Sequence, residues 1–258
     1  MTRVGVVGAT GKMGREVCRA VVLADDLTLD GAVSRTAPGQ LVADVLALPE
    51  AGDLRYTDTL ASLLEARIEV LVDFTNASFA PEHIAWGIEH GVHVVVGTTG
   101  FPIDDAWRAA PVGIVIGPNF SIGAVLMQRF AAAAAPHLDA AEIVELHHDG
   151  KADAPSGTAL ATARGIAAAR PGPPRPAPGG DDDHPGARGT DVEGVRVHSV
   201  RLPGLVAHQE VLFGGSGETL TIRHDTTDRA AFMPGVLLAI RAAASRPGLT
   251  VGLDPLLD

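Results

Sequence analysis

Cysteine is nearly absent from this chain, since Cys18 is the only one in 258 residues. No disulfide can form within a single chain, so a reducing, cytoplasmic setting is the simpler interpretation. We expect Cys18 to lie in the core. Long apolar runs are also missing, because Gly, Pro or charged residues interrupt every candidate before the roughly 18 to 20 residues that a membrane helix requires. The opening residues resemble a signal peptide only until Gly11, Lys12 and Gly14 interrupt them, and we interpret them as mature structure.

Clusters of basic residues are absent as well. The formal net charge is −11 at pH 7, and no basic run of any length occurs. Because phosphate backbones are bound by clustered Lys and Arg, this composition disfavours a nucleic acid partner, and the charge also disfavours an anionic membrane surface. With 46% hydrophobic residues over this length, the composition predicts a soluble globular protein of one large domain or two modest ones.

The N-terminal segment has the order strand, glycine turn, helix. Val4–Val7 is a short apolar strand that leads into G-A-T-G-K-M-G, and Arg15–Leu23 then has helical periodicity. Gly8, Gly11 and Gly14 allow a tight turn and let backbone amides approach a diphosphate at the positive end of the helix. The spacing G-x-x-G-x-x-G differs from the commoner G-x-G-x-x-G, so an ordinary glycine turn is the alternative. The strand–turn–helix context favours a dinucleotide site.

The end of the next expected strand, Leu27–Val33, bears on the choice of cofactor. In nicotinamide-binding units an acidic side chain at this place hydrogen-bonds the ribose 2′-hydroxyl of NAD, whereas an arginine accepts the 2′-phosphate of NADP. This chain has Ser34 and Arg35 here and no acid. We therefore expect NADPH, with a solvated surface charge as the alternative for Arg35.

Three more apolar strands are expected in the first half of the chain, and each ends in small or polar residues. Nearly continuous apolar strands separated by helices indicate a parallel sheet covered on both faces. Ligands bind outside the carboxyl ends of such strands, so the three turns should line one crevice with the glycine loop. The expected strands are Val70–Phe74, Val92–Val96 and Val112–Ile116, the helices are Leu60–Ala66, Pro81–His90 and Asp104–Ala109, and the turns are Asp73–Thr75, Gly97–Gly100 and Gly117–Ser121.

The pattern changes after Ser121. Strands that follow one another suggest a separate sheet, mixed or antiparallel, and a segment rich in Pro, Gly and Asp is typical of a flexible loop. The expected helices are 122–138, Thr158–Ala169 and Arg229–Ala244, the loop is 171–191, and the strands are Ile143–His147, Val195–Leu202, His208–Phe213 and Thr219–His224.

The junction Glu142–Ala159, which reads E-I-V-E-L-H-H-D-G-K-A-D-A-P-S-G-T-A, concentrates chemically active residues between a strand and a helix start. His147, His148 and Lys151 place proton donors and positive charge beside helix N-terminal amides, where an anion is readily held. Lysine is otherwise found only at Lys12, in the glycine loop, against 18 arginines in the chain. A compact ammonium that can donate a proton is a reason for lysine at these places, with chance as the alternative.

The helix start offers a seat for a carboxylate, with Ser156 as the expected N-cap and the amides of Gly157 and Thr158 behind it. Three other uses of the junction compete. Metal binding needs three or four converging ligands, whereas adjacent strand histidines point apart and no Cys/His spacing completes a site. A serine hydrolase would need a G-x-S-x-G elbow, but Ala-Pro precedes Ser156. A solvated polar loop is the third. We interpret the junction as a metal-free acid/base and carboxylate site facing a nicotinamide.

Several motifs occur in an order that points to one family. The histidine motif E-L-H-H-x-x-K-x-D-A-P-S-G-T-A is highly specific, and it is accompanied by G-A-T-G-K-M-G, D-F-T, V-G-T-T-G-F, P-N-F-S-I-G and V-H-S-V-R-L-P-G-L-V-A-H-Q-E-V-L-F-G. Together these resemble the 4-hydroxy-tetrahydrodipicolinate (dihydrodipicolinate) reductases over most of the chain. The resemblance implies NAD(P)H-dependent reduction of a cyclic, imine-containing dicarboxylate to tetrahydrodipicolinate, with loss of water, in diaminopimelate and lysine biosynthesis.

The resemblance also implies the fold class, which is α/β. A Rossmann-like parallel-sheet domain would comprise residues 1–121 and 229–258, and bind the dinucleotide. A smaller α+β domain with a mixed sheet would comprise residues 122–228, carry substrate contacts and build a homotetramer.

Residue roles follow from the same resemblance. His147 resembles the general acid/base and Lys151 the proton donor, and Arg35 matches the position that meets the 2′-phosphate. Ser34 departs from the acid that many members have, which puts NADH use in question. The substrate-carboxylate contacts are His148, Ser156, Gly157 and Thr158, and the cofactor contacts are Gly8, Ala9, Thr10, Gly11, Lys12, Met13, Gly97, Thr98, Thr99, Gly117, Pro118, Asn119 and Phe120.

Two other functions are kept as alternatives. One is a non-catalytic NADP-binding sensor, which has no need of His147 and Lys151 together at a carboxylate seat. The other is a reductase of a different small oxo or imino acid on the same two-domain plan.

Overall fold

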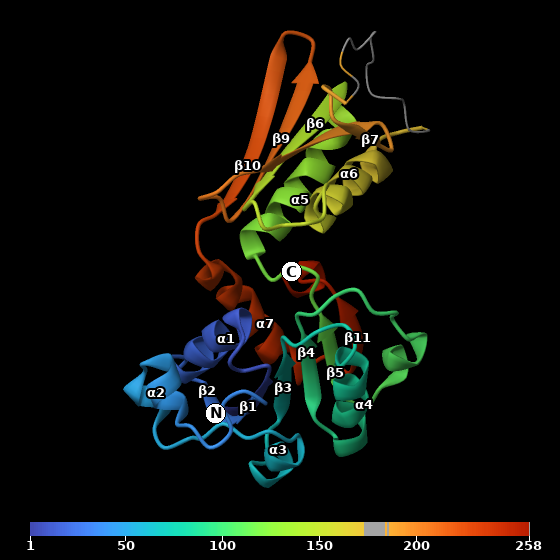
Figure 1. Ribbon diagram of the computed structural model, residues 1–258. Coiled ribbons are helices and arrows are strands. Elements are labelled where there is room, and N and C mark those ends of the chain that lie inside the picture. The colour runs from blue at the N-terminus through green and yellow to red at the C-terminus, as the bar shows by residue number, and fades with distance from the viewer. Residues whose placement is uncertain (173–183, 185, 258) are drawn as a thin grey trace. The chain divides into compact units, whose positions relative to one another are not determined.

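The computed structural model describes residues 1–172, 184 and 186–257 of the chain. The chain divides into two compact units, Met1–Ile122 with Phe232–Asp258, and Gly123–Ala231. Figure 1 shows a sheet with its own helices in each. Most of the predicted loop 171–191 lies outside the described residues, and near its end the chain forms the short strand β7 (Thr190–Val192) instead of a loop. No described helix is both long and apolar enough to cross a membrane.

The first unit contains a six-stranded sheet in the order β11-β5-β4-β3-β1-β2. Every neighbouring pair is parallel, as the apolar strands predicted. All residues of β3 and β5 are buried, which is the burial expected of strands covered on both faces. The strands are β1 (Thr2–Val7), β2 (Leu27–Val33), β3 (Val70–Asp73), β4 (His93–Val96), β5 (Gly113–Ile116) and β11 (Gly248–Val251).

Strand β1 sets the position where a ligand can enter this sheet. It pairs with β2 on one side and with β3 on the other, so the order of strands along the chain changes direction at β1. Outside the carboxyl ends of strands at such a point, parallel sheets bind their ligands. The strand β11 was not predicted. It is a four-residue edge strand of which only Gly248 is buried, so its sequence carries little of the periodicity that reveals a strand.

The helices of the first unit follow the predicted segments, with shifted ends. α1 (Lys12–Val22) begins three residues earlier than predicted, because Gly11 is already its N-cap. The predicted helix Asp104–Ala109 is the 3-10 helix η2 (Asp105–Ala109). The predicted C-terminal helix divides into η4 (Arg229–Phe232) and α7 (Met233–Ala243), which has a proline in its first turn. The others are α2 (Val42–Leu46), which was not predicted, α3 (Ala61–Glu65), α4 (Ala80–His90), η1 (Pro49–Ala51) and η5 (Asp254–Leu256).

The second unit contains a mixed five-stranded sheet in the order β10-β9-β6-β8-β7. Only the β6–β8 pair is parallel, which confirms the prediction of a separate sheet. Its strands besides β7 are β6 (Ala140–His147), β8 (Val195–Arg201), β9 (Ala207–Gly215) and β10 (Glu218–Thr226), and its helices are α5 (Ile122–Ala134), which η3 (Ala135–His137) follows, and α6 (Gly157–Ala169).

Helices α5 and α6 pack on one face of the mixed sheet (Figure 1). Ile143, Val211 and Phe213 of the sheet pack there against Ala163 and Ile166 of α6. Strand residues alternate between faces, so residue 145, two positions after Ile143, also points to this covered face. That residue is a glutamate that is fully buried, and it is the centre of the polar network described below.

Candidate active site

The glycine loop joins β1 to α1 in a conformation that brings backbone amides together. Gly8 has φ +76°, which favours glycine, and the amides of Gly8 and Ala9 donate to the Val33 carbonyl at 3.1 Å. Lys12 and Met13 form the start of α1. A Cβ at Gly14 would overlap the carbonyl oxygen of Gly8, so loop and helix approach each other as a diphosphate cradle requires. The loop therefore fits a dinucleotide.

Gly14→Ala tests this close approach. The added methyl group displaces the backbone at Gly8 and opens the cradle, so we expect the Kd for NADPH to rise about tenfold, measured by titration of nucleotide fluorescence. Gly165→Ala is the matched control, since it adds the same group to a helix where nothing lies within 4 Å. It should leave the Kd unchanged and stabilise α6 slightly. Equal nucleotide affinity in both variants would contradict the proposed cradle.

A pocket of about 400 Å³ opens at the ends of β1, β2 and β3, and its lining includes Gly8, Thr10, Gly11 and Arg35. Three hydroxyl groups in its wall touch one another. The Thr10 oxygen lies 2.6 Å from that of Ser34 and 3.0 Å from that of Thr36, and Ser34 and Thr36 are 3.1 Å apart. Hydroxyls can rotate to donate, so this hydroxyl cluster can turn its protons toward an anion.

Aromatic and charged side chains complete the same pocket. The Arg35 guanidinium carbon lies 4.9 Å from the ring centroid of Phe79, and Phe79 stacks on His83 at 6.2 Å. His83 Nδ1 is 2.8 Å from the buried Asp73 carboxylate, which also accepts from the amide and hydroxyl of Thr75, each at 2.6 Å. The buried Asp73 carboxylate thus holds the D-F-T turn in place through hydrogen bonds. A cation held over a ring is positioned with little loss of mobility on binding a ligand.

The turns after β4 and β5 lie at the same edge of the sheet, beside this pocket wall. A Cβ at Gly97 would overlap the ring of Phe74, and the rings of Phe74 and Phe120 are 5.7 Å apart. A Cβ at Gly117 would overlap the Phe120 ring. The structure therefore brings together the predicted turns 97–99 and 117–120, although their residues do not line the pocket itself.

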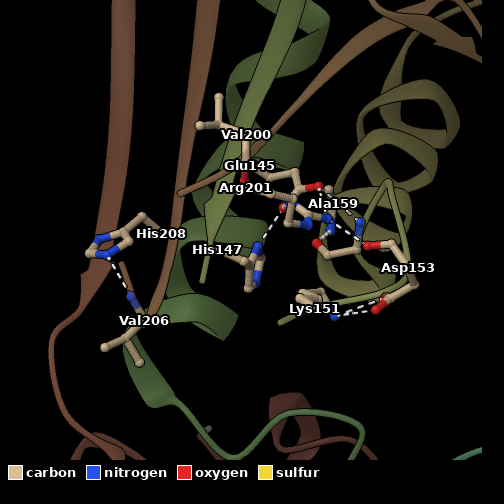
Figure 2. A network of polar contacts seen from close by, with 10 residues as sticks. Glu145, His147, Lys151, Asp153, Ala159, Val200, Arg201, Val206 and His208 are labelled. Carbon is tan, nitrogen blue, oxygen red and sulfur yellow. Dashed lines mark hydrogen bonds and ion pairs between the residues drawn. The ribbon is translucent and has the colours of Figure 1, made fainter. Parts of the chain in front are cut away.

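The histidine junction is organised around Glu145, as Figure 2 shows. Its carboxylate is fully buried, lies 2.5 Å from His147 Nδ1, and accepts two bonds from Arg201, at 2.8 and 3.0 Å. The Ser156 amide is a further donor at 3.3 Å. Burial on its own would raise the pKa of Glu145, but hydrogen bonds from His147, Arg201 and Ser199 outweigh it and lower the pKa from 4.5 to about 2.

The charge state of Glu145 follows from that pKa. Its folded pKa lies below the ordinary value, so the ionised carboxylate stabilises the fold at neutral pH, and this contribution is lost only as the pH falls from about 4.5 toward 2. An ionised carboxylate only accepts hydrogen bonds. The proton in the His147 contact is therefore on Nδ1, which leaves Nε2 as the nitrogen that can exchange a proton with a ligand.

Lys151 and His148 follow β6 in an exposed turn. The Lys151 amide donates to the His148 carbonyl at 3.1 Å, and the Lys151 ammonium is 2.7 Å from the Asp153 carboxylate. This contact, foremost, lowers the pKa of Asp153. His148 is exposed, whereas His147 is largely covered, so the two adjacent histidines have different surroundings.

Ser156 is the N-cap of α6, as predicted. Its hydroxyl accepts from the Ala159 amide at 3.1 Å, and the residue is buried, so its side chain is occupied by the cap. Gly157 is exposed, and nothing lies within 4 Å of the place where its Cβ would be. Space is therefore open beside Gly157 at the start of α6, as a carboxylate seat needs. No group of three or more His, Cys, Asp or Glu side chains that could hold a metal occurs among the described residues.

Sequence reasoning missed Glu145, Arg201 and Asp153 in the junction, and Thr36 and Phe79 in the pocket. Glu145 and Arg201 are 56 positions apart, and only the parallel pairing of β6 with β8 brings them together. A usable signal was present for Glu145. It is an acid in the buried phase of an apolar alternation, which requires a partner.

The chain combines two features. Its parallel-sheet unit carries a glycine-rich dinucleotide loop, and the mixed-sheet unit that follows in the chain carries a histidine–lysine junction. Together they define a two-domain dinucleotide-dependent oxidoreductase. Comparison with known proteins specifies the family. Residues 2–120 match "Dihydrodipicolinate reductase, N-terminus" and residues 123–257 match "Dihydrodipicolinate reductase, C-terminus". The chain belongs to the dihydrodipicolinate reductase family.

Individual relatives match the chain over nearly their full lengths. The chain is 52% identical to the 4-hydroxy-tetrahydrodipicolinate reductase of Nocardia farcinica, covering 99% of this chain and 98% of the relative. It is 50% identical to that of Mycolicibacterium vanbaalenii, covering 99% of each. The dipicolinate-bound dihydrodipicolinate reductase of Paenisporosarcina sp. TG-14 superposes with a TM-score of 0.85 at 37% identity over 99% of both chains. GenD2 from gentamicin A biosynthesis, in complex with NAD, shares the fold alone, with a TM-score of 0.62 at 16% identity over 99% of this chain and 90% of GenD2.

Proposed function

We propose that this chain reduces 4-hydroxy-tetrahydrodipicolinate to tetrahydrodipicolinate, with loss of water and with a reduced pyridine nucleotide, in diaminopimelate and lysine biosynthesis. The observation that supports it most is the junction at the end of β6, where a histidine with a fixed tautomer and a lysine precede a capped helix N-terminus with open space beside it. The full-length identity of about half to proteins with this activity supports the same reaction.

The junction residues would bind the substrate and move its protons. Gly157 and Thr158 present the first-turn amides of α6 to a carboxylate, with exposed His148 contributing a further hydrogen bond. Ser156 contributes through the cap that holds this turn in place. His147 exchanges a proton through Nε2, and Lys151 supplies one from its ammonium once the substrate competes with Asp153 for it. These groups complete the proton transfers that accompany loss of the 4-hydroxyl and reduction of one ring double bond by the hydride and a proton.

The first unit would hold the nucleotide. When bound, a reduced nicotinamide supplies the hydride. We infer a preference for NADPH, because the wall of the pocket combines the Thr10–Ser34–Thr36 hydroxyl cluster with the Arg35 guanidinium and contains no acid at position 34. The remaining candidates, 97–99 and 117–120, would contact the nucleotide from the same edge of the sheet.

The charge of the substrate has to be reconciled with a chain of formal charge −11. Exposed charges are screened beyond the Debye length, about 8 Å at physiological salt. Lys151, the histidines and the α6 N-terminus are close to the seat, so they outweigh distant carboxylates. We also expect a homotetramer in a cytoplasmic setting, in keeping with the family resemblance and the single cysteine.

The direct test follows NADPH absorbance while a dihydrodipicolinate synthase supplies the substrate in situ. We expect oxidation that depends on both proteins. A rate no higher than that of the synthase alone would contradict the proposed reaction, and nucleotide binding without oxidation would favour a sensor. Oxidation with another small oxo or imino acid, at a higher kcat/KM, would favour a different reductase.

A further inference from the structure

We propose that Glu145 is a positioning residue for this reaction. Its buried carboxylate fixes the tautomer and the orientation of the His147 ring, and Arg201 fixes the carboxylate in turn. The inference rests on the proposed function, which gives His147 the proton transfer, and it assigns a role to the V-H-S-V-R-L-P-G segment that the other observations leave unexplained.

The pattern of hydrogen bonds distinguishes this arrangement from a simple structural ion pair. Arg201 bonds both carboxylate oxygens, which already satisfies a buried ion pair. His147 nevertheless bonds one of the same oxygens, since its Nδ1 lies 2.5 Å from Glu145 Oε2. The His147 ring is largely covered at the end of its strand. His83 also has a buried carboxylate on Nδ1, that of Asp73, and there the contact fixes a turn. The buried, ionised acceptor of His147 instead lies on the strand that leads into the Lys151 turn and the α6 N-cap. Such an acceptor sets which nitrogen carries the proton, which is the requirement of an acid/base group.

The backbone of the sheet makes the three side chains a rigid set. Glu145 and His147 lie two residues apart on β6 and so face the same side, and His147 and Arg201 are register partners on the parallel strands β6 and β8. All three are carried by central strands, where functional groups are held more closely than on loops. The exposed turn that follows could move without changing the orientation of the His147 ring.

Arg201 links this set to the lysine turn. Besides Glu145, its guanidinium donates to the Asp153 carbonyl at 2.6 Å and to the Val200 carbonyl at 2.8 Å. Asp153 is also the residue whose carboxylate holds the Lys151 ammonium. One arginine thus braces both proton-transfer groups, His147 through Glu145 and Lys151 through the turn at Asp153.

Arg201 also removes an electrostatic problem. An unpaired carboxylate beside His147 would repel a dicarboxylate substrate, and in a buried setting this repulsion is poorly screened. The bidentate pair with Arg201 carries no net charge, so Glu145 can orient the imidazole without disfavouring the dianion.

Glu145→Gln tests the proposal, with Glu142→Gln as the matched control. Glu142 is on the same strand and also contacts a histidine, His198, at 2.8 Å. We expect Glu145→Gln to lower kcat/KM about 10- to 100-fold and to leave the Kd for NADPH unchanged. Glu142→Gln should leave the rate within about twofold. Unchanged turnover in Glu145→Gln would overturn the proposal.

A second variant separates positioning from stability. In Glu145→Gln, either orientation of the new side-chain amide would direct its NH2 group toward Arg201, another donor, so this variant is expected to unfold at a lower temperature. Glu145→Gln/Arg201→Met removes that conflict. Because Arg201 also braces the Lys151 turn through Asp153, the double variant is compared with Arg201→Met alone. If Glu145 only stabilises the fold, these two variants should turn over at the same rate. If it positions His147, the double variant stays slower than Arg201→Met although its Tm recovers.

The tautomer can be observed without turnover. A long-range ¹H–¹⁵N correlation spectrum should show His147 protonated at Nδ1 in the wild type and a mixture of tautomers in Glu145→Gln. Protonation of neutral His147 at Nε2 in the wild type would overturn the proposal, whatever reaction the chain catalyses. Absence of reductase activity with the expected spectrum would instead overturn the proposed function alone.

Discussion

Lys151→Ala and His147→Ala are each expected to lower kcat for 4-hydroxy-tetrahydrodipicolinate by roughly 10² to 10⁴-fold, the range that a positioned acid or base contributes. In Lys151→Ala the ammonium is lost and the Asp153 carboxylate is left without its 2.7 Å partner. In His147→Ala the Nε2 proton-exchange group is lost while Glu145 keeps Arg201. Initial rates of NADPH oxidation, with the synthase in excess, measure both effects.

The same variants should bind NADPH with wild-type Kd, because the glycine loop and the hydroxyl cluster belong to the first unit. His148→Ala is the contrasting variant, and we expect it to raise KM more than it lowers kcat, since the exposed His148 ring is a carboxylate contact without a proton-transfer role. Loss of nucleotide binding in Lys151→Ala or His147→Ala would show that these residues act elsewhere, and full turnover would exclude them from the chemistry.

The parallel sheet could be predicted because each of its inner strands is a nearly continuous apolar run. The D-F-T motif, which begins at the last residue of β3, then indicated that a turn follows. Nothing local showed that His83 contacts Asp73. Edge strands and short helices were less predictable. β7 and β11 are short and largely exposed. They therefore lack the buried apolar run that made the four-residue strands β3, β4 and β5 recognisable.

Some residues of the candidate site could likewise be predicted from the sequence, and others could not. His147, Lys151 and the Ser156 cap lie within one stretch of ten residues, so spacing and cap chemistry were enough to bring them together. Glu145 and Arg201 needed the register of β6 with β8, which depends on tertiary pairing and not on local sequence. In the pocket, Ser34 and Arg35 could be predicted as one signal, whereas Thr36 joined Thr10 only through the turn that follows β2.

The second large expected effect is a change in the preference for NADPH over NADH. Arg35→Ala removes the cation held over Phe79, and loss of a charge-assisted contact of about 1.5–3 kcal/mol corresponds to a fall of roughly 10- to 100-fold in kcat/KM with NADPH. The Ser34 oxygen lies 2.6 Å from the Thr10 hydroxyl, so adding Ser34→Asp places a carboxylate at this point of the pocket wall. The carboxylate repels a 2′-phosphate and accepts a hydrogen bond from a ribose 2′-hydroxyl. The double variant should lower the NADPH:NADH ratio of kcat/KM about 10³-fold.

Arg108→Ala is the control for this effect, because Arg108 is a surface arginine of the same unit, paired with Asp105 and absent from the pocket lining. It should leave the ratio unchanged. A wild-type ratio near one would mean that the hydroxyl cluster and Arg35 do not discriminate between the nucleotides. If the ratio falls in Arg35→Ala but no further in the double variant, the preference comes from attraction to the phosphate alone. If the ratio falls further in the double variant, an acid at position 34 disfavours NADPH. Ser34 then contributes to the specificity because it does not repel the 2′-phosphate.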